Sequence, residues 1–139
     1  MIEDCTGFTC ARAVWDITTG DARRFADRLG LLVHALESFR AQGIAPDFVV
    51  LLHGPATQFA SRTLAGTKFD PATDETIAPA RAALAQAVAS GARVEVCRIA
   101  MDRCHIGADN LLPGLAVEEN VFVNAIALQN RGYAYLPIA

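Results

Sequence analysis

Residues 48–52 have the sequence Phe-Val-Val-Leu-Leu, a continuous β-rich apolar run that begins after Pro46 and ends at His53-Gly54-Pro55. A strand with one solvated face would alternate apolar and polar residues, whereas a continuous run is typical of a strand buried on both faces. Such strands occur in parallel sheets, because the crossover connections place helices over both faces. The run therefore predicts an α/β fold with a buried central strand.

Segments with strand and helix character alternate on both sides of this run. Residues 13–17 predict a strand, and residues 22–42 predict a helix with Asp21 as N-cap and Gly43 as C-cap. After the run, the sequence predicts helices at 57–64, 76–90, 99–106 and 121–130, strands at 93–97, 115–117 and 133–136, and an irregular excursion or lid at 66–74. This alternation indicates a parallel sheet covered by helices on both faces.

Length and composition narrow the class of protein. The 139 residues suit one domain, residues 1–139, with residues 1–11 expected to be a flexible N-terminal segment. A hydrophobic content of 53% excludes a disordered chain, and no apolar run approaches the roughly 18 residues that span a bilayer. The net charge of −3 does not favour nucleic acid or anionic lipid. The acidic start at residues 1–5 is unlike a signal peptide, so we expect a cytoplasmic protein without a membrane partner.

Four cysteines are the residues with the most chemical potential. In the cytoplasm, a cysteine is usually a buried apolar residue, a metal ligand or a nucleophile. The pairs Cys5 and Cys10, and Cys97 and Cys104, lack CxxC spacing, so a zinc site is not favoured and we expect no metal. Neither a GxGxxG nor a GxxxxGK[ST] motif is present, so no nucleotide or other cofactor is expected.

Ligands of open α/β sheets bind beyond the carboxyl ends of the strands. The residues that follow the predicted strands form the candidate cleft: Thr18, Thr19, Gly20, Asp21, His53, Gly54, Cys97, Arg98 and Asn120. The segment 18–21 offers hydroxyl and backbone N–H groups at a helix start, which can hold an anion.

Cys97 is the candidate nucleophile of this cleft. It lies where a strand passes into a helix, and Arg98 and Arg103 add positive charge, so both features favour the thiolate. The alternative is that Cys97 is a small apolar residue that closes the strand. His53 can act as its proton partner, although a histidine at this position is more often structural.

The other thiols are weaker candidates. Cys104 lies two helical turns from Cys97, roughly 10 Å along the axis, too far for a disulfide, which needs Cα atoms within about 7 Å. We therefore interpret Cys104 as a secondary thiol or helix filler rather than a resolving cysteine. Cys5 and Cys10 can pair with each other, with a second subunit or with a metal, but a frayed terminus without a role is favoured.

The order and spacing of several segments resemble the DsrE/DsrF-like family of small sulfur-relay proteins. The matching segments lie from residue 13 onward and comprise residues 51–55, residues 94–97 with the helix to 106, residues 109–114, and residues 128–135. The resemblance implies a three-layer α/β/α sandwich with a mostly parallel five-stranded sheet and a homo-oligomer (dimer, trimer or hexamer) or hetero-oligomer. In some members a cysteine carries sulfur as a persulfide, and that position corresponds to Cys97. Many relatives have small residues after it, where this chain has Arg98 and Ile99.

These observations leave three functional hypotheses. The first is a sulfur carrier with sulfurtransferase-type activity, in which Cys97 accepts sulfur, Arg98 stabilises the thiolate and His53 moves the proton between a donor and an acceptor protein. The second is a non-catalytic oligomeric module that binds a small ligand or protein in the same cleft. The third is a redox or metal sensor that uses Cys5 and Cys10. The high apolar content suggests that another subunit covers part of the surface.

Overall fold

The sheet contains five parallel strands in the order β4-β3-β2-β1-β5. The structure is a computed structural model that describes residues 8–139. The strands are β1 (Cys10–Ile17), β2 (Ala45–Leu52), β3 (Arg93–Cys97), β4 (Leu115–Glu118) and β5 (Ala134–Ile138). Because every strand runs in the same direction, all five carboxyl ends meet at one edge of the sheet, which is where the sequence predicts the cleft.

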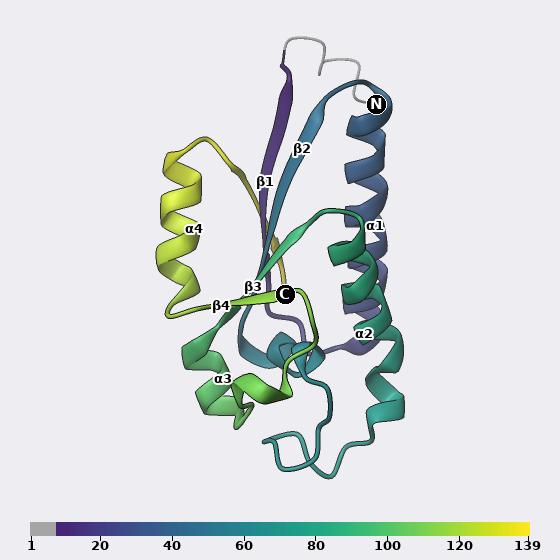
Figure 1. Ribbon diagram of the computed structural model, residues 1–139, viewed down its shortest axis with the longest axis vertical. Coiled ribbons are helices and arrows are strands. Elements are labelled where there is room, and N and C mark those ends of the chain that lie inside the picture. The colour runs from purple at the N-terminus through teal and green to yellow at the C-terminus, as the bar shows by residue number, and fades with distance from the viewer. Residues whose placement is uncertain (1–7) are drawn as a thin grey trace.

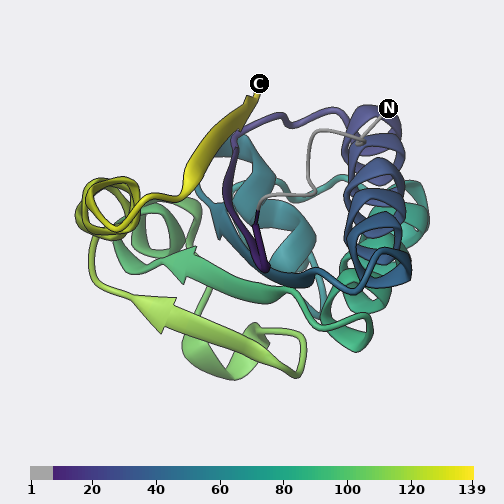
Figure 2. The same cartoon turned by 90° about the horizontal axis from the view of Figure 1, so that it is seen from above.

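Helices cover both faces of the sheet, so the predicted three-layer α/β/α architecture is confirmed (Figures 1 and 2). In Figure 1, α1 and α2 lie to the right of the strands and α4 lies to the left. The helical elements are α1 (Ala22–Ala41), α2 (Asp74–Ala89), α3 (Arg98–Cys104), α4 (Val121–Asn130), and the 3-10 helices η2 (Gly54–Ala60) and η3 (Ala108–Asn110).

Strand β2 is buried on both faces, as the run at 48–52 predicts. Phe48, Val50 and Leu52 belong to the larger core, which lies against α1 and α2. Val49 and Leu51 belong to a smaller core with residues of α3 and α4. A single apolar run therefore supplies both halves of the interior, because successive side chains of a strand point to opposite faces.

Local signals determine the ends of α1. The Asp21 carboxylate accepts a hydrogen bond of 2.9 Å from the Arg24 N–H, as the predicted N-cap should. Gly43 follows the helix with φ of +73°, a conformation that glycine adopts without a Cβ penalty. The helix ends at Ala41, one residue before its predicted end.

The helical segment predicted at 57–64 is confirmed only over residues 57–60, and its type and bounds differ. A 3-10 helix, η2, occupies Gly54–Ala60 instead, and the chain after it is held by Asn110. The Thr63 N–H donates to the Asn110 side-chain oxygen at 3.0 Å, and the Asn110 amide donates back to the Thr63 carbonyl at 2.9 Å. These bonds join residues 47 positions apart and replace the local bonds that a helix would need.

Other boundaries differ by a few residues. Strand β1 begins at Cys10, where it pairs with Ala45 of β2, so residues 10 and 11 belong to the sheet rather than to a flexible segment. Helix α3 ends at Cys104, because His105 has a left-handed φ of +56°. Cys5 lies outside the described residues.

The excursion at 66–74 has no helix or strand apart from the first residue of α2, in agreement with the sequence. Asp74 anchors its far end by accepting hydrogen bonds from the Leu64 N–H and the Arg81 guanidinium. The Lys68 N–H donates to the Cys104 carbonyl at 2.9 Å. This backbone bond attaches the excursion to the end of α3.

Candidate functional site

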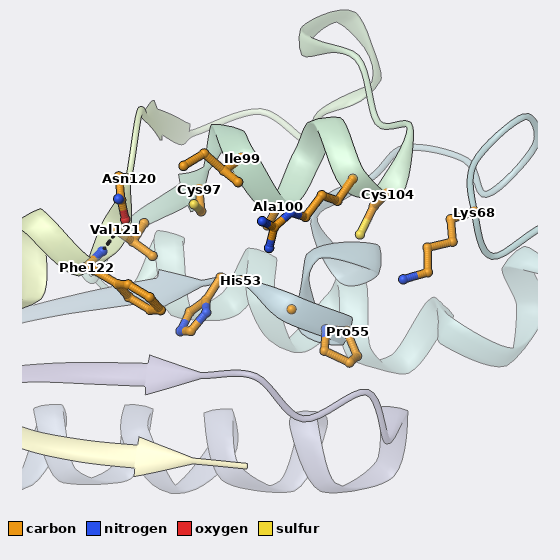
Figure 3. Close-up of a pocket in the computed structure, with 12 residues that line it drawn as sticks. His53, Pro55, Lys68, Cys97, Ile99, Ala100, Cys104, Asn120, Val121 and Phe122 are labelled. Atoms are coloured by element: carbon orange, nitrogen blue, oxygen red, sulfur yellow. Dashed lines mark hydrogen bonds between the residues drawn. The ribbon is translucent and has the colours of Figure 1, made fainter.

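A cavity of about 470 Å³ opens at the carboxyl edge of the sheet (Figure 3). It is bounded by the ends of β2 and β3, helix α3, the start of α4, and the excursion that follows η2. The residues that line it are His53, Gly54, Pro55, Lys68, Cys97, Ile99, Ala100, Arg103, Cys104, Asn120, Val121 and Phe122. Four candidates from the sequence, His53, Gly54, Cys97 and Asn120, lie around this one space, together with the secondary thiol Cys104.

Cys97 is the last residue of β3 and the residue immediately before α3. Its exposed fraction is 6%, and it packs in the smaller core beside Val49 and Leu51. The residue nevertheless contributes to the cavity wall (Figure 3). A small ligand that enters the cavity can therefore reach a thiol that is largely shielded from bulk solvent.

His53 follows β2 directly and is held by a carboxylate. Its Nε2 is hydrogen-bonded to the Oδ1 atom of Asp16 in β1. The ring of Phe122 meets the imidazole edge to face, with centroids 5.4 Å apart and an interplanar angle of 90°. A neutral imidazole that donates from Nε2 retains Nδ1 as a proton acceptor. The structure thus fixes the orientation of the only imidazole among the described residues that line the cavity.

The same carboxylate has a second partner in β5. The hydroxyl of Tyr135 donates to Asp16 Oδ2. This hydrogen bond raises the pKa of the Tyr135 phenol, because a phenolate would lie against the Asp16 carboxylate. Asp16 is therefore bonded on both oxygens, and the residues Asp16, His53 and Tyr135, here called the strand-end triad, connect β1, β2 and β5.

Cys104 and Lys68 lie at the other end of the cavity from Cys97 and Asn120 (Figure 3). Burial raises the pKa of the Cys104 thiol, although the charge of Lys68 and a hydrogen bond with Thr57 oppose this effect. A raised pKa keeps the thiol protonated and less nucleophilic. Burial thus makes Cys104 poorly suited to attack a substrate.

Arg98 does not line the cavity. Its guanidinium forms an ion pair with Glu119 at 2.8 Å, on the surface where β4 passes into α4. Arg103, which follows one turn later on α3, is the arginine that lines the cavity. Of the two arginines that the sequence assigns to this site, Arg103 thus lines the cavity and Arg98 does not, and Lys68 supplies a second positive charge.

The segment 18–21 is at the same sheet edge but does not line the cavity. The Thr19 hydroxyl accepts a hydrogen bond from the Asp21 N–H, and Asp21 caps α1. A Cβ on Gly20 would lie 2.7 Å from the Pro55 side chain, so this glycine permits close packing against η2. The groups that the sequence predicts to hold an anion therefore form local contacts instead.

Asn120 serves the start of α4. Its side-chain oxygen accepts a hydrogen bond of 3.0 Å from the Phe122 N–H (Figure 3). This is an N-cap bond, and it orients the first turn of the helix towards the cavity. The residue thus lines the site and also positions Phe122.

Sequence reasoning did not identify Asp16, Tyr135, Lys68 or Phe122. One signal was available for Lys68, which is the only lysine of the chain and lies in the excursion that was interpreted as a lid. Asp16 also stands out as a carboxylate within an otherwise apolar strand end. Tyr135 and Phe122 gave no local signal, because their roles depend on contacts with β1 and β2.

Within residues 8–139, no group of three or more histidine, cysteine, aspartate or glutamate residues is placed to hold a metal ion. The same part of the chain contains no helix long and apolar enough to cross a membrane.

The fold and the site together define a parallel α/β/α sandwich with a buried cysteine at the edge of its sheet. Residues 13–138 match the DsrE/DsrF-like family, and the chain belongs to that family. The solved structure of the protein of unknown function MTH1491 from Methanobacterium thermoautotrophicum is similar, with a TM-score of 0.66 and 18% identity over 91% of this chain and 98% of that chain. A likeness at this identity supports the fold alone. No curated protein matches the chain.

Proposed function

We propose that this protein is a sulfur carrier with sulfurtransferase-type activity, which accepts sulfur on Cys97 as a persulfide and relays it to a partner. The observation that carries the proposal is that Cys97 shares one cavity with His53, whose imidazole is held by Asp16. A nucleophile, a positioned proton acceptor and an orienting carboxylate are the parts that an activated thiol requires. Membership in a family named for sulfur-relay proteins agrees with this chemistry.

The loading step is a thiol–persulfide exchange. His53 accepts the Cys97 proton, and the thiolate attacks the outer sulfur of a donor persulfide, R–S–SH. A new S–S bond forms at Cys97 while the S–S bond of the donor breaks, and the leaving thiolate takes the proton back from His53. The Cys97 sulfur is oxidised and the inner donor sulfur is reduced, so no external oxidant is needed.

The relay step is the same exchange in reverse order. A thiolate of an acceptor protein attacks the outer sulfur of the Cys97 persulfide, and Cys97 leaves as a thiolate. A reducing compartment such as the cytoplasm suits both steps, because it keeps the thiols unpaired. We further propose a homo-oligomer, in which a second subunit covers the exposed apolar side chains of α4.

The proposal is tested by cyanolysis, which releases persulfide sulfur as thiocyanate. After incubation with a persulfide donor, the wild-type protein should release about one equivalent, and Cys97→Ser should release almost none. Cys104→Ser and Cys10→Ser are matched controls and should behave as the wild type. The loaded protein should also transfer its sulfur to an acceptor thiol. Equal release from the wild type and a folded Cys97→Ser protein would contradict the proposal.

A non-catalytic binding module is the alternative. The exposed fraction of only 6% at Cys97 favours it, because a thiol that merely fills the interior would be equally shielded. This alternative predicts that Cys97→Ser leaves ligand binding intact and that the thiol reacts no faster than an ordinary buried cysteine. The cyanolysis experiment separates the two functions.

A further inference from the structure

The cavity carries positive charge without a matching carboxylate in its wall. Lys68 and Arg103 line it, and none of its lining residues within the described part of the chain is Asp or Glu. Asp16 lies behind His53, where both of its oxygens are already hydrogen-bonded. The wall therefore favours an anion over a cation or a neutral ligand.

Among the residues that the structure describes, neither cation has an ion-pair partner. Within residues 8–139, salt bridges form at Arg28, Arg81, Arg93, Arg98 and His53, whereas Lys68 and Arg103 form none. Arg98 and Arg103 belong to the same helix, but of these two only Arg98 forms an ion pair with a carboxylate of the described residues. The two cations that line the cavity are thus available to a ligand.

Lys68 is held over the cavity rather than left on a free loop. Its backbone N–H is bonded to the Cys104 carbonyl, and the Thr67 hydroxyl donates to the Leu64 carbonyl at 2.7 Å. Thr67 is itself buried. These bonds fix the backbone from which the ammonium group extends into the cavity (Figure 3).

The size and the remaining walls indicate an organic ligand. A volume of about 470 Å³ lies within the range of small-molecule sites, about 300–1,000 Å³, and far exceeds a single inorganic ion. Five apolar residues also line the cavity, with Val121 and Phe122 at the Asn120 end (Figure 3): Pro55, Ile99, Ala100, Val121 and Phe122. A ligand that suits this cavity has an anionic group, an apolar or neutral body and a group that reaches Cys97.

We propose that the cavity binds a low-molecular-weight thiol persulfide that carries carboxylates, and that this molecule is the sulfur donor. Its carboxylate pairs with Lys68 and Arg103, and its outer sulfur lies at Cys97. This inference rests on the proposed function and assigns its substrate class. The step is the exchange given above: the Cys97–S bond to the outer sulfur forms, the donor S–S bond breaks, and the donor leaves as a carboxylate-bearing thiol.

Binding is tested without sulfur transfer by titrating S-methylglutathione, an unreactive anionic thioether, into the protein in a calorimeter. The wild type and Cys97→Ser should bind it equally. Lys68→Gln and Arg103→Gln should each weaken binding by about tenfold, as expected for loss of a charge-assisted hydrogen bond, and Lys68→Arg should restore it. Arg131→Gln, a surface variant outside the cavity, should bind as the wild type. Absence of binding, or equal affinity of the wild type and Lys68→Gln, would overturn the inference.

Donor selectivity is tested by loading kinetics. Glutathione persulfide, an anion, should load Cys97 about tenfold more slowly in Lys68→Gln than in the wild type, whereas cysteamine persulfide, which carries an ammonium group, should load both at the same rate. Equal rates for both donors in the wild type and in Lys68→Gln would overturn the substrate class and leave sulfur acceptance standing. Lys68-dependent binding of S-methylglutathione with no loading by either donor would support the anion site and contradict the proposed function.

Discussion

At the scale of single residues, the proposed chemistry depends on the Asp16–His53 pair of the strand-end triad. Asp16 is bonded to His53 on one oxygen and to Tyr135 on the other, and the Phe122 ring meets the imidazole edge to face. An imidazole restrained in this way has a defined donor and a defined acceptor nitrogen. The proposed role of His53 therefore rests on this restraint of its ring.

Asp16→Asn should slow the loading of Cys97 by about tenfold or more at neutral pH, and His53→Gln by about a hundredfold. Stopped-flow kinetics with a persulfide donor measures these rates. Tyr135→Phe is the control, since it leaves the Asp16–His53 bond in place. A wild-type loading rate in folded Asp16→Asn or His53→Gln protein would contradict the proposed role of this pair.

The two tyrosines should titrate above their ordinary pKa. Hydrogen bonds to Asp47 and Asp16 raise the pKa values of Tyr133 and Tyr135, respectively. A folded pKa above the unfolded value means that stability is fully present below about pH 10 and is lost as the pH rises through the folded pKa. Ultraviolet absorbance should therefore show that both phenols ionise above about pH 10. Asp16→Asn should lower the pKa of Tyr135 and leave that of Tyr133 unchanged. Ionisation of both phenols at or below pH 10 in the folded protein would contradict the assignment.

At the scale of secondary-structure elements, the sequence was most informative where local signals act. Helix α4 has its predicted bounds. Helix α1 begins directly after Asp21 and ends shortly before Gly43, as the capping residues predict. The helical segment predicted at 57–64 ends at Ala60 instead, and the backbone of Arg62 and Thr63 is bonded to Asn110, far along the chain. Local periodicity carries no information on such a bond, so neither η2 nor the placement of Lys68 could be predicted.

The apolar stripe of α1 provides a matched pair of substitutions in one helix. Leu29 is fully buried, whereas Leu31 is 56% exposed. Leu29→Ala should lower the free energy of unfolding by about 2–5 kcal/mol, because it removes buried methyl groups and leaves a cavity. Leu31→Ala should change it by less than about 0.5 kcal/mol. Urea denaturation measures both, and similar losses in the two variants would contradict the assigned face of the helix.

At the scale of the whole molecule, parallel topology explains why distant residues share one cavity. The carboxyl ends of the strands gather at one edge, so His53, Cys97 and Asn120 come together as the sequence predicts. Position at the carboxyl end of a strand does not show which residues line the cavity. For this reason the predicted cleft also included segment 18–21 and Arg98. Their side chains have local partners instead. Tertiary contacts, rather than strand position alone, therefore decide which candidates line the site.

The outer face of α4 should mediate self-association. Its side chains Val123 and Ile126 have exposed fractions of 63% and 62%, which is unusual for neighbouring large apolar residues. Ile126→Glu should shift the protein to a monomer in sedimentation velocity, because it would bury a charge in the interface. Leu31→Glu, an exposed site on α1, should leave the association unchanged. A wild-type protein that sediments strictly as a monomer would contradict the prediction.

The central claim concerns which sulfur atom is modified. The deciding measurement is peptide-level mass spectrometry after exposure to a persulfide donor, with all cysteine peptides of the wild type and Cys97→Ser compared. We predict a mass gain of one sulfur on the peptide that contains Cys97 and no gain on that peptide in the variant. An unmodified Cys97 in the folded wild type, or a gain only at Cys5, Cys10 or Cys104, would contradict the claim.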